Sequence, residues 1–169
     1  ELVESLESEL EGVKGYVILT DKEHMPDTKL SNAMCYEDLI SCESDEFTWP
    51  EFDENTASSL CYTSGTTGNP KGVLYSHRST ILHAWIVSSG NVAKVSSSTC
   101  ILPVVPMFHV NAWGIPYAGA MFGAKLVFPG PALDGASVYE LIDNEKPDLL
   151  MGVPTVWLGL LQHLNETNQ

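Results

Sequence analysis

From residue 57 onward, short apolar stretches alternate with longer stretches whose apolar residues recur at helical spacing. Helices that alternate with strands in this way cover the faces of a sheet, mostly parallel. The sequence therefore predicts an α/β fold in which sheet and helices form layers. The predicted strands are 60–63, 72–75, 100–105, 125–128 and 148–152, and the predicted helices are 78–89, 110–122, 137–144 and a last helix that Pro154 opens.

The first third of the chain gives weaker signals. Leu2, Leu6 and Leu10 recur at four-residue spacing, which predicts a short amphipathic helix over residues 2–11. A strand is predicted at 16–19, and residues 20–56 read as an irregular connection with one short helix at 36–40. We therefore divide the chain into an acidic connecting part, residues 1–56, and a core, residues 57–169.

The net charge of −14 is unevenly distributed. Residues 1–54 hold 16 acidic and 3 basic residues, a balance of −13, whereas residues 55–169 hold 6 acidic and 5 basic residues, a balance of −1. An acid-rich surface repels phosphate, which argues against nucleic acid as a partner. No apolar run reaches the roughly 18–20 residues that a transmembrane helix needs.

The four cysteines give no sign of a metal site or a redox motif. They are Cys35, Cys42, Cys61 and Cys100, and no two of them have Cys-x-x-Cys spacing. Cys61 and Cys100 lie in apolar runs and are predicted to be buried. Reduced thiols are typical of a cytoplasmic protein.

The most distinctive motif lies between the first two predicted strands of the core and reads Thr63-Ser-Gly-Thr-Thr-Gly-Asn-Pro-Lys-Gly72. Its glycines let backbone N–H groups approach a ligand, and its hydroxyls and lysine add donors and positive charge. These features suit a triphosphate. The motif is not a Walker A loop, because Asn69 and Pro70 separate Gly68 from Lys71 and a strand follows. The plainer alternative is a polar surface turn.

A second motif surrounds His109 in the stretch Pro103-Val-Val-Pro-Met-Phe-His-Val-Asn-Ala-Trp-Gly114. This histidine follows the predicted strand 100–105, and α/β proteins build binding sites at the carboxyl ends of their strands. A histidine among apolar residues is, however, more often packed in a core. The residues alone leave both interpretations open.

Together the two motifs resemble those of the adenylate-forming (AMP-binding) enzymes, whose phosphate-binding loop reads Thr-Ser-Gly-Thr-Thr-Gly-x-Pro-Lys-Gly. A chance match to nine fixed positions is on the order of 1 in 10^11 at typical residue frequencies. The match continues to Gly152-Val-Pro-Thr-Val-Trp157 and is most similar to medium- and long-chain fatty-acyl-CoA synthetases. The resemblance implies a central part of the large, layered N-terminal domain of such an enzyme.

The resemblance also implies roles for particular residues. His109 would be the catalytic residue that orients the acyl carboxylate and ATP, Val110 would contact the acyl-adenylate, and Trp113 would lie near the acyl tunnel and gate it. Lys71 would neutralise phosphate charge, and Thr63 would help to hold Mg²⁺. The residues implied to bind the β- and γ-phosphates of ATP are Thr63, Ser64, Gly65, Thr66, Thr67 and Gly68.

The implied reaction joins a fatty acid or another small carboxylate to ATP as an acyl-adenylate and passes the acyl group to coenzyme A. Members of this branch often form homodimers. Complete members carry further motifs and a C-terminal domain that do not occur before Gln169, and the chain does not begin with methionine. We therefore expect a piece of a longer protein that is inactive by itself.

Several alternatives stay open at this point. Aryl-acid–CoA ligases, luciferases and amino-acid adenylation domains belong to the same superfamily, although the segment 110–122 lacks the acidic residue that an amino-acid substrate would require. A plain NTPase is disfavoured by the non-Walker pattern. A non-catalytic module that binds nucleotide or acyl groups is a further possibility. The small residues Gly114, Ala118, Gly119 and Ala120 suit an acyl chain and close helix packing equally well.

Overall fold

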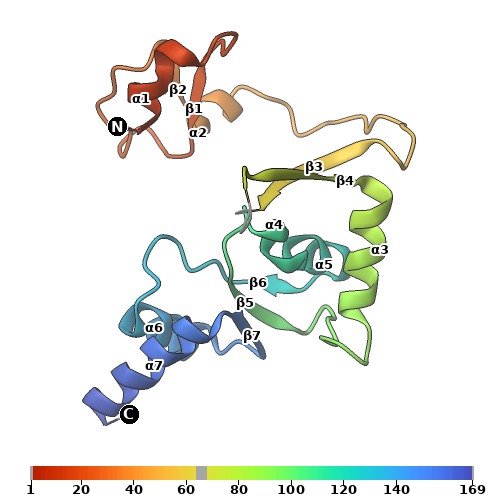
Figure 1. The fold of residues 1–169 in the computed structure, drawn as a ribbon, viewed down its shortest axis with the longest axis vertical. Helices are drawn as coiled ribbons and strands as arrows, with labels where there is room; N and C mark the ends of the chain where they lie inside the picture. Colours follow the sequence, from red (N-terminus) through yellow and green to blue (C-terminus); the bar gives the residue numbers. More distant parts are fainter. Residues whose placement is uncertain (1, 64–67, 169) are drawn as a thin grey trace. The chain divides into compact units, whose positions relative to one another are not determined.

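The computed structural model describes residues 2–63 and 68–168. The chain divides into two compact units, the first ending at Glu51 and the second beginning at Phe52 (Figure 1). Within the described ranges, no helix is both long enough and apolar enough to cross a membrane.

The first unit contains two short parallel strands and three short helical segments. The carboxylate of Glu4, in the first helix, accepts hydrogen bonds from the Thr28 hydroxyl and the Lys29 N–H, both at 2.8 Å. These bonds attach the helix to a segment 24 residues later in the chain. The elements are α1 (Leu2–Leu6), the 3-10 helix η1 (Glu7–Glu9), β1 (Tyr16–Ile18), β2 (Ala33–Cys35) and α2 (Tyr36–Ile40).

Two of the sequence predictions for this unit need correction. The helix predicted over 2–11 ends its α-helical part at Leu6 and continues only as a 3-10 turn. The segment predicted to be irregular contains β2, which pairs with β1 in the register Tyr16 to Ala33. A strand of three residues is too short to show the alternating pattern by which strands are recognised.

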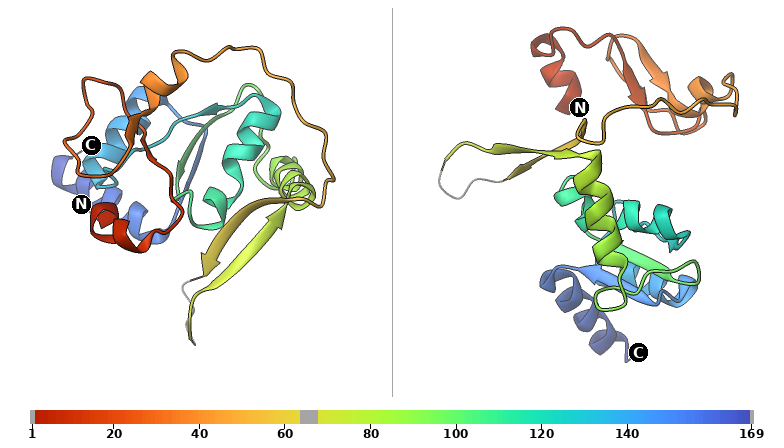
Figure 2. Two further views of the ribbon diagram at one scale, coloured as in Figure 1. Left: turned by 90° about the horizontal axis from the view of Figure 1, so that it is seen from above. Right: turned by 90° about the vertical axis from the view of Figure 1, so that its right-hand side faces the viewer.

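The second unit begins with an antiparallel hairpin of β3 (Ala57–Thr63) and β4 (Lys71–Ser76). Helix α3 (His77–Ser88) follows β4 without an intervening loop. The two strands extend away from the rest of this unit (Figure 2). The predicted phosphate loop connects the two strands in the sequence, from Thr63 at the end of β3 to Lys71 at the start of β4.

A three-stranded parallel sheet forms the centre of the second unit, with strand order β6-β5-β7. Helices connect the parallel strands, as the sequence predicted, and this arrangement confirms the α/β fold. The bounds are β5 (Cys100–Val104), α4 (Val110–Trp113), α5 (Ile115–Phe122), β6 (Lys125–Leu126), α6 (Gly135–Glu145), β7 (Leu149–Gly152) and α7 (Pro154–Thr167).

Helices cover both faces of the central strand β5, whose five residues are all buried. On one face, Leu102 and Val104 pack with Val138 and with apolar side chains of α6 and α7. On the other, Ile101 packs with Ile115 at the start of α5. Figure 1 shows α5 and the α6–α7 pair on opposite sides of the sheet. A parallel strand covered on both faces reads as a continuous apolar run, which is why the sequence identified it.

Candidate active site

The β3–β4 hairpin places the two ends of the predicted phosphate loop side by side. Thr63, the last residue of β3, pairs with Lys71, the first residue of β4. Side chains of directly opposed residues in an antiparallel pair share one face of the sheet. Both side chains are exposed. An oxyanion at this end of the hairpin can therefore meet a hydroxyl donor and a positive charge.

Four of the predicted phosphate-binding residues, Ser64, Gly65, Thr66 and Thr67, lie outside the described residues, and their roles stay predictions. Gly68 is described and exposed, and its φ of 156° is rare for residues with a side chain. Glycine adopts such a conformation without steric cost. The backbone conformation at position 68 thus explains why a glycine occupies it.

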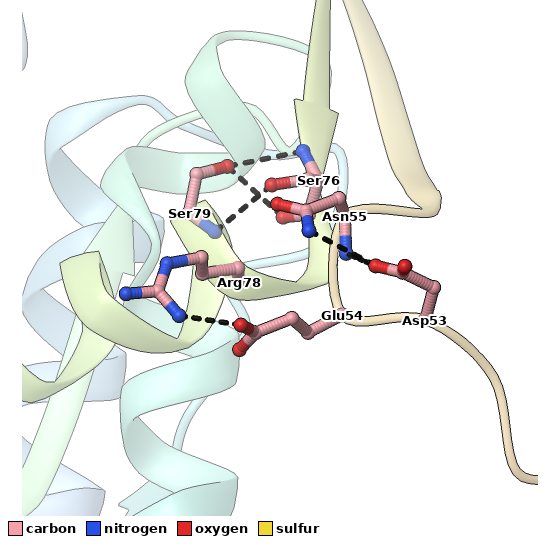
Figure 3. A network of polar contacts seen from close by, with 6 residues as sticks. All are labelled: Asp53, Glu54, Asn55, Ser76, Arg78 and Ser79. Atoms are coloured by element: carbon pink, nitrogen blue, oxygen red, sulfur yellow. Dashed lines mark hydrogen bonds and ion pairs between the residues drawn. The ribbon is translucent and has the colours of Figure 1, made fainter.

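Hydroxyl side chains hold the base of the hairpin to the start of α3 (Figure 3). The Ser76 hydroxyl accepts a hydrogen bond from the Ser79 N–H at 3.1 Å, and the Ser79 hydroxyl accepts one from the Ser76 N–H at 3.0 Å. This reciprocal arrangement is a capping box, which satisfies two N–H groups at the start of the helix. The direction of α3 is therefore fixed relative to β4.

Charged residues before the hairpin contact the same region (Figure 3). Arg78 and Glu54 form an ion pair at 2.5 Å, but both side chains are exposed and such pairs contribute little. The Asp53 carboxylate accepts hydrogen bonds from the backbone N–H and the side-chain amide of Asn55, which lower the pKa of Asp53. These groups shape a turn, and we assign them no part in the chemistry.

His109 lies in an exposed turn beyond the carboxyl end of β5. The strand ends at Val104, and the His109 N–H donates to the carbonyl oxygen of Pro106 at 3.0 Å. The imidazole is exposed and makes no hydrogen bond to any described residue of the chain. Core packing therefore does not account for His109, and its ring is accessible to a ligand.

The segment after His109 is left-handed, which corrects the prediction of one helix over 110–122. Val110, Asn111, Ala112 and Trp113 have φ values of 48°, 51°, 50° and 56°, and Gly114 follows at 74°. Right-handed helix resumes only in α5. The left-handed conformation costs roughly 1–2 kcal/mol for each residue with a side chain. Such strain persists only where the surrounding structure enforces it.

Asn111 connects this left-handed turn to the strand that leads into the phosphate loop. Its side-chain amide donates to the Ser59 hydroxyl at 2.9 Å, and its side-chain oxygen accepts from the Cys61 thiol at 3.4 Å. Both partners belong to β3, which ends at Thr63. The phosphate-loop hairpin and the His109 segment are therefore joined by side-chain hydrogen bonds.

The far end of the turn contacts α3. The Nε2 atom of His83 lies 3.1 Å from the Trp113 carbonyl oxygen, which requires the tautomer with a proton on Nε2. The same ring covers Gly114, where an added Cβ would lie 2.5 Å from Cδ2 of His83. Glycine at position 114 thus meets two requirements, a positive φ and space for the imidazole.

A cavity of about 250 Å³ lies where the hairpin, α3, the turn and α5 meet. The turn contributes Val110, which is 39% exposed, and Gly114. Trp113 is half-buried but does not line the cavity. Its remaining lining residues are Tyr75, Ser79, Thr80, His83, Asn111 and Tyr117.

The structure also separates the two interpretations of the small residues near α5. A Cβ at Gly119 would lie 2.7 Å from a methyl group of Leu126, so this glycine allows α5 to pack closely on β6. Ala118 is likewise fully buried. Gly114 alone among the four lines the cavity, whereas Ala120 is exposed.

Sequence reasoning missed Asn111, Ser59 and His83. No local pattern distinguishes them, because their partners lie 52 and 30 positions away in the chain. For a metal, the described residues contain no group of three or more His, Cys, Asp or Glu side chains that could hold one. Mg²⁺ commonly takes only one or two protein oxygens and completes its coordination with water and phosphate, and the Thr63 hydroxyl suits that pattern.

Comparison with protein families gives one match that extends over nearly the whole chain. A family model described as AMP-binding enzyme matches residues 2–169. Among curated proteins, a medium-chain-fatty-acid–CoA ligase of Ectopseudomonas oleovorans is 53% identical over 160 residues, covering 95% of this chain and 29% of the relative. A 3-methylmercaptopropionyl-CoA ligase of Ruegeria lacuscaerulensis is 51% identical, covering 96% of this chain and 30% of the relative.

Among solved structures, an anthranilate CoA ligase in complex with anthranoyl-AMP superposes with a TM-score of 0.73. The two chains are 25% identical, and the match covers 92% of this chain and 29% of the other. This chain thus spans less than a third of the length of each of these proteins.

Proposed function

Because this chain belongs to the AMP-binding enzyme family, we propose that the whole protein activates a fatty acid with ATP and then transfers the acyl group to coenzyme A. The observation that carries this proposal is the junction at Asn111. There the strand that leads to the phosphate loop meets a cavity lined largely by apolar groups, with the exposed His109 two residues away. A nucleotide triphosphate and an acyl group could be held next to each other at such a junction.

In the first half-reaction, a carboxylate oxygen of the fatty acid would attack the α-phosphorus of ATP. The new bond is the carboxyl–phosphate bond of the acyl-adenylate, and the bond that breaks releases pyrophosphate. In the second, the sulfur of coenzyme A would attack the acyl carbon, giving the thioester and AMP. The first half-reaction brings several anions together, so positive charge and oriented donors lower its barrier.

The phosphate loop would supply those groups. We assign the β- and γ-phosphates to the loop that runs from Thr63 to Gly68, with Lys71 opposite Thr63 as a point positive charge. Bound Mg²⁺, held in part by the Thr63 hydroxyl, would neutralise further phosphate charge. His109 would donate a hydrogen bond to the carboxylate or the α-phosphate and so orient the two reactants.

The acyl group would occupy the cavity beside the turn, in contact with Val110. Its volume of about 250 Å³ lies just below the usual range for small-molecule sites, roughly 300–1,000 Å³. The relatives include ligases named for a medium-chain fatty acid and for 3-methylmercaptopropionate, a far shorter acid. We propose a medium- or long-chain acid for this protein. Trp113 does not line the cavity, and as the tunnel gate it would control access for acids of every length.

Carboxylate-dependent exchange of pyrophosphate into ATP tests the proposal. The full-length protein would be assayed with linear acids from acetate to palmitate, with 3-methylmercaptopropionate and with benzoate or anthranilate. A maximum at medium or long chains is the expected result. A maximum with the thioether acid or the aromatic acids would overturn the fatty-acid assignment, whereas no exchange with any acid would overturn adenylation itself.

Measurements of phosphate release and of ATP binding separate the other two functional classes. A plain NTPase would release phosphate from ATP without a carboxylate. A non-catalytic module would bind ATP or an acyl group and give neither exchange nor hydrolysis.

We also propose a cytoplasmic location and a homodimeric assembly for the whole protein. The free thiols of Cys35, Cys42, Cys61 and Cys100 fit a reducing compartment. Fractionation of cells and light scattering of the purified protein test these two assignments.

A further inference from the structure

The left-handed turn after His109 is held at both ends by contacts with other elements. Asn111 bonds to Ser59 and Cys61 on β3, and the Trp113 carbonyl bonds to His83 on α3. Left-handed conformation in four successive residues with side chains is unfavourable in an isolated chain. These external bonds are therefore part of what keeps the turn in place.

Asn111 serves the turn in two separable ways. Asparagine tolerates the left-handed conformation better than most residues because its short polar side chain can form local hydrogen bonds. Its side chain also uses both of its functional groups, since the amide donates to Ser59 and the oxygen accepts from Cys61. Backbone tolerance alone would be served equally well by glycine, whereas the two bonds to β3 require a side chain with two polar groups.

These bonds connect two segments that bind different reactants in the proposed reaction. Cys61 precedes Thr63 by two residues on β3, where the phosphate loop begins. Asn111 follows His109 by two residues and Val110 by one, and it also lines the cavity. Movement of the turn relative to β3 would change the distance between the nucleotide phosphates and the acyl carboxylate.

We propose that Asn111 is a positioning residue that sets the alignment of the acyl site with the phosphate loop through Ser59 and Cys61. This inference rests on the proposed function, because the alignment matters only for a reaction between the two bound groups. Asn111 lines the cavity proposed for the acyl group, but the positioning role does not depend on that contact. It acts by fixing the turn that carries His109 and Val110.

The test compares three substitutions of Asn111 in the full-length protein. Asn111→Gly still allows the positive φ, because glycine adopts it freely, but it removes both side-chain hydrogen bonds. Asn111→Ala removes the bonds and also disfavours the backbone conformation. Asn111→Asp keeps the shape and can accept from both the Ser59 hydroxyl and the Cys61 thiol. For each, kcat and KM of carboxylate-dependent pyrophosphate exchange would be measured per folded enzyme.

We expect Asn111→Gly and Asn111→Ala to lose about tenfold to a hundredfold in kcat, because small misplacements of reacting groups have effects of this order. The KM for ATP and for the acid should change far less, since each site remains intact by itself. Asn111→Asp should recover part of the loss. Ser59→Ala should lower kcat in the same direction, and combining it with Asn111→Ala should add little further loss.

Asn32 offers a matched control in the first unit. It too has a positive φ, 54°, and its side-chain amide donates to the Lys14 carbonyl at 3.3 Å. Asn32→Ala should therefore lower thermal stability as an Asn111 variant does, yet leave kcat unchanged.

Two results would overturn the inference, and they are distinguishable. If the wild-type protein shows no carboxylate-dependent exchange, the proposed function fails and the positioning role fails with it. If the wild-type protein is active and Asn111→Gly keeps its kcat, the proposed function stands and only the positioning role is wrong. Should Asn111 variants fail to fold, an unchanged kcat in Ser59→Ala would overturn the inference in their place.

Discussion

The imidazole Nε2 of His83 lies 3.1 Å from the carbonyl oxygen of Trp113, although the two residues are 30 positions apart. This contact depends on Gly114, because the ring occupies the space where any other residue would carry its Cβ. The α3 helix thus holds the far end of the left-handed turn, as β3 holds its beginning. The contribution of Gly114 to stability can therefore be measured.

We expect Gly114→Ala to destabilise the protein by more than about 1 kcal/mol. Its φ of 74° already disfavours a side chain by roughly 1–2 kcal/mol. In addition, the new Cβ would lie 2.5 Å from the His83 ring, which must move. Thermal denaturation of the purified variant measures the loss.

Gly90 and Gly159 provide matched controls for that substitution. A Cβ at either position would meet no atom within 4 Å, and neither glycine has a positive φ. Gly159 lies inside α7, where alanine is favoured over glycine by up to about 1 kcal/mol. Gly159→Ala should therefore raise the melting temperature, and Gly90→Ala should leave it nearly unchanged. A stability loss in Gly90→Ala as large as in Gly114→Ala would contradict the steric explanation.

Lys71 should contribute to ATP affinity rather than to folding. Lys71 is exposed and lies opposite Thr63, where the predicted phosphate loop joins the two strands. A hydrogen bond to a charged group is worth about 1.5–3 kcal/mol. Lys71→Ala should accordingly raise the Kd for ATP by about tenfold to a hundredfold, as measured by titration calorimetry. Lys22→Ala, which removes an exposed lysine of the first unit, is the control and should leave ATP binding unchanged.

The elements that the sequence predicted best are those whose patterns are local. The buried run of β5 and the apolar spacing in α6 and α7 located these elements to within a few residues. The short helix over Tyr36–Ile40 was also correct. In each of these elements, the residues that pack together recur at regular positions along the chain. Periodicity is therefore sufficient to locate the element.

The turn at 110–113 was missed because apolar spacing carries no information about the handedness of a backbone. A run such as Val110-Asn-Ala-Trp113 fits a right-handed helix as well as it fits the left-handed turn that the structure shows. What decides between them is tertiary: the bonds from Asn111 to β3 and from Trp113 to His83. For the same reason, the sequence indicated His109 and Lys71 through their motifs but did not indicate the contacts that Ser59 and His83 make with the turn.

The stability of the first unit should fall in acid through Glu4. The pKa of Glu4 is lowered from 4.5 to about 2, chiefly by the hydrogen bond from the Lys29 N–H and next by the one from the Thr28 hydroxyl. Because the pKa is lower in the folded state, the carboxylate stabilises this unit fully above pH 4.5, and the contribution is lost as the pH falls towards 2. Hydrogen-exchange protection of β1 and β2 should therefore be greater in the wild type than in Glu4→Gln near neutral pH.

That difference between wild type and Glu4→Gln should shrink as the pH falls from 4.5 to 2. Glu11→Gln removes a nearby carboxylate that makes no hydrogen bond in the described part of the chain, and it serves as the control. A difference that stayed constant down to pH 2 would show that the shape of the side chain matters and its ionisation does not.

Tyr117 should limit the length of acyl chain that the cavity accepts. Tyr117 lines the cavity from α5, and Tyr117→Ala would enlarge it. Each further methylene that becomes buried is worth about 0.8 kcal/mol, or about fourfold in kcat/KM. The preferred acid should therefore become longer. A profile of kcat/KM against the chain length of the acid measures this change.

Trp113 lies outside the lining, so Trp113→Ala should lower activity equally at all chain lengths. If only Trp113→Ala changed the profile, the acyl chain would run past Trp113, as the family resemblance implies, and the assignment to this cavity would be wrong.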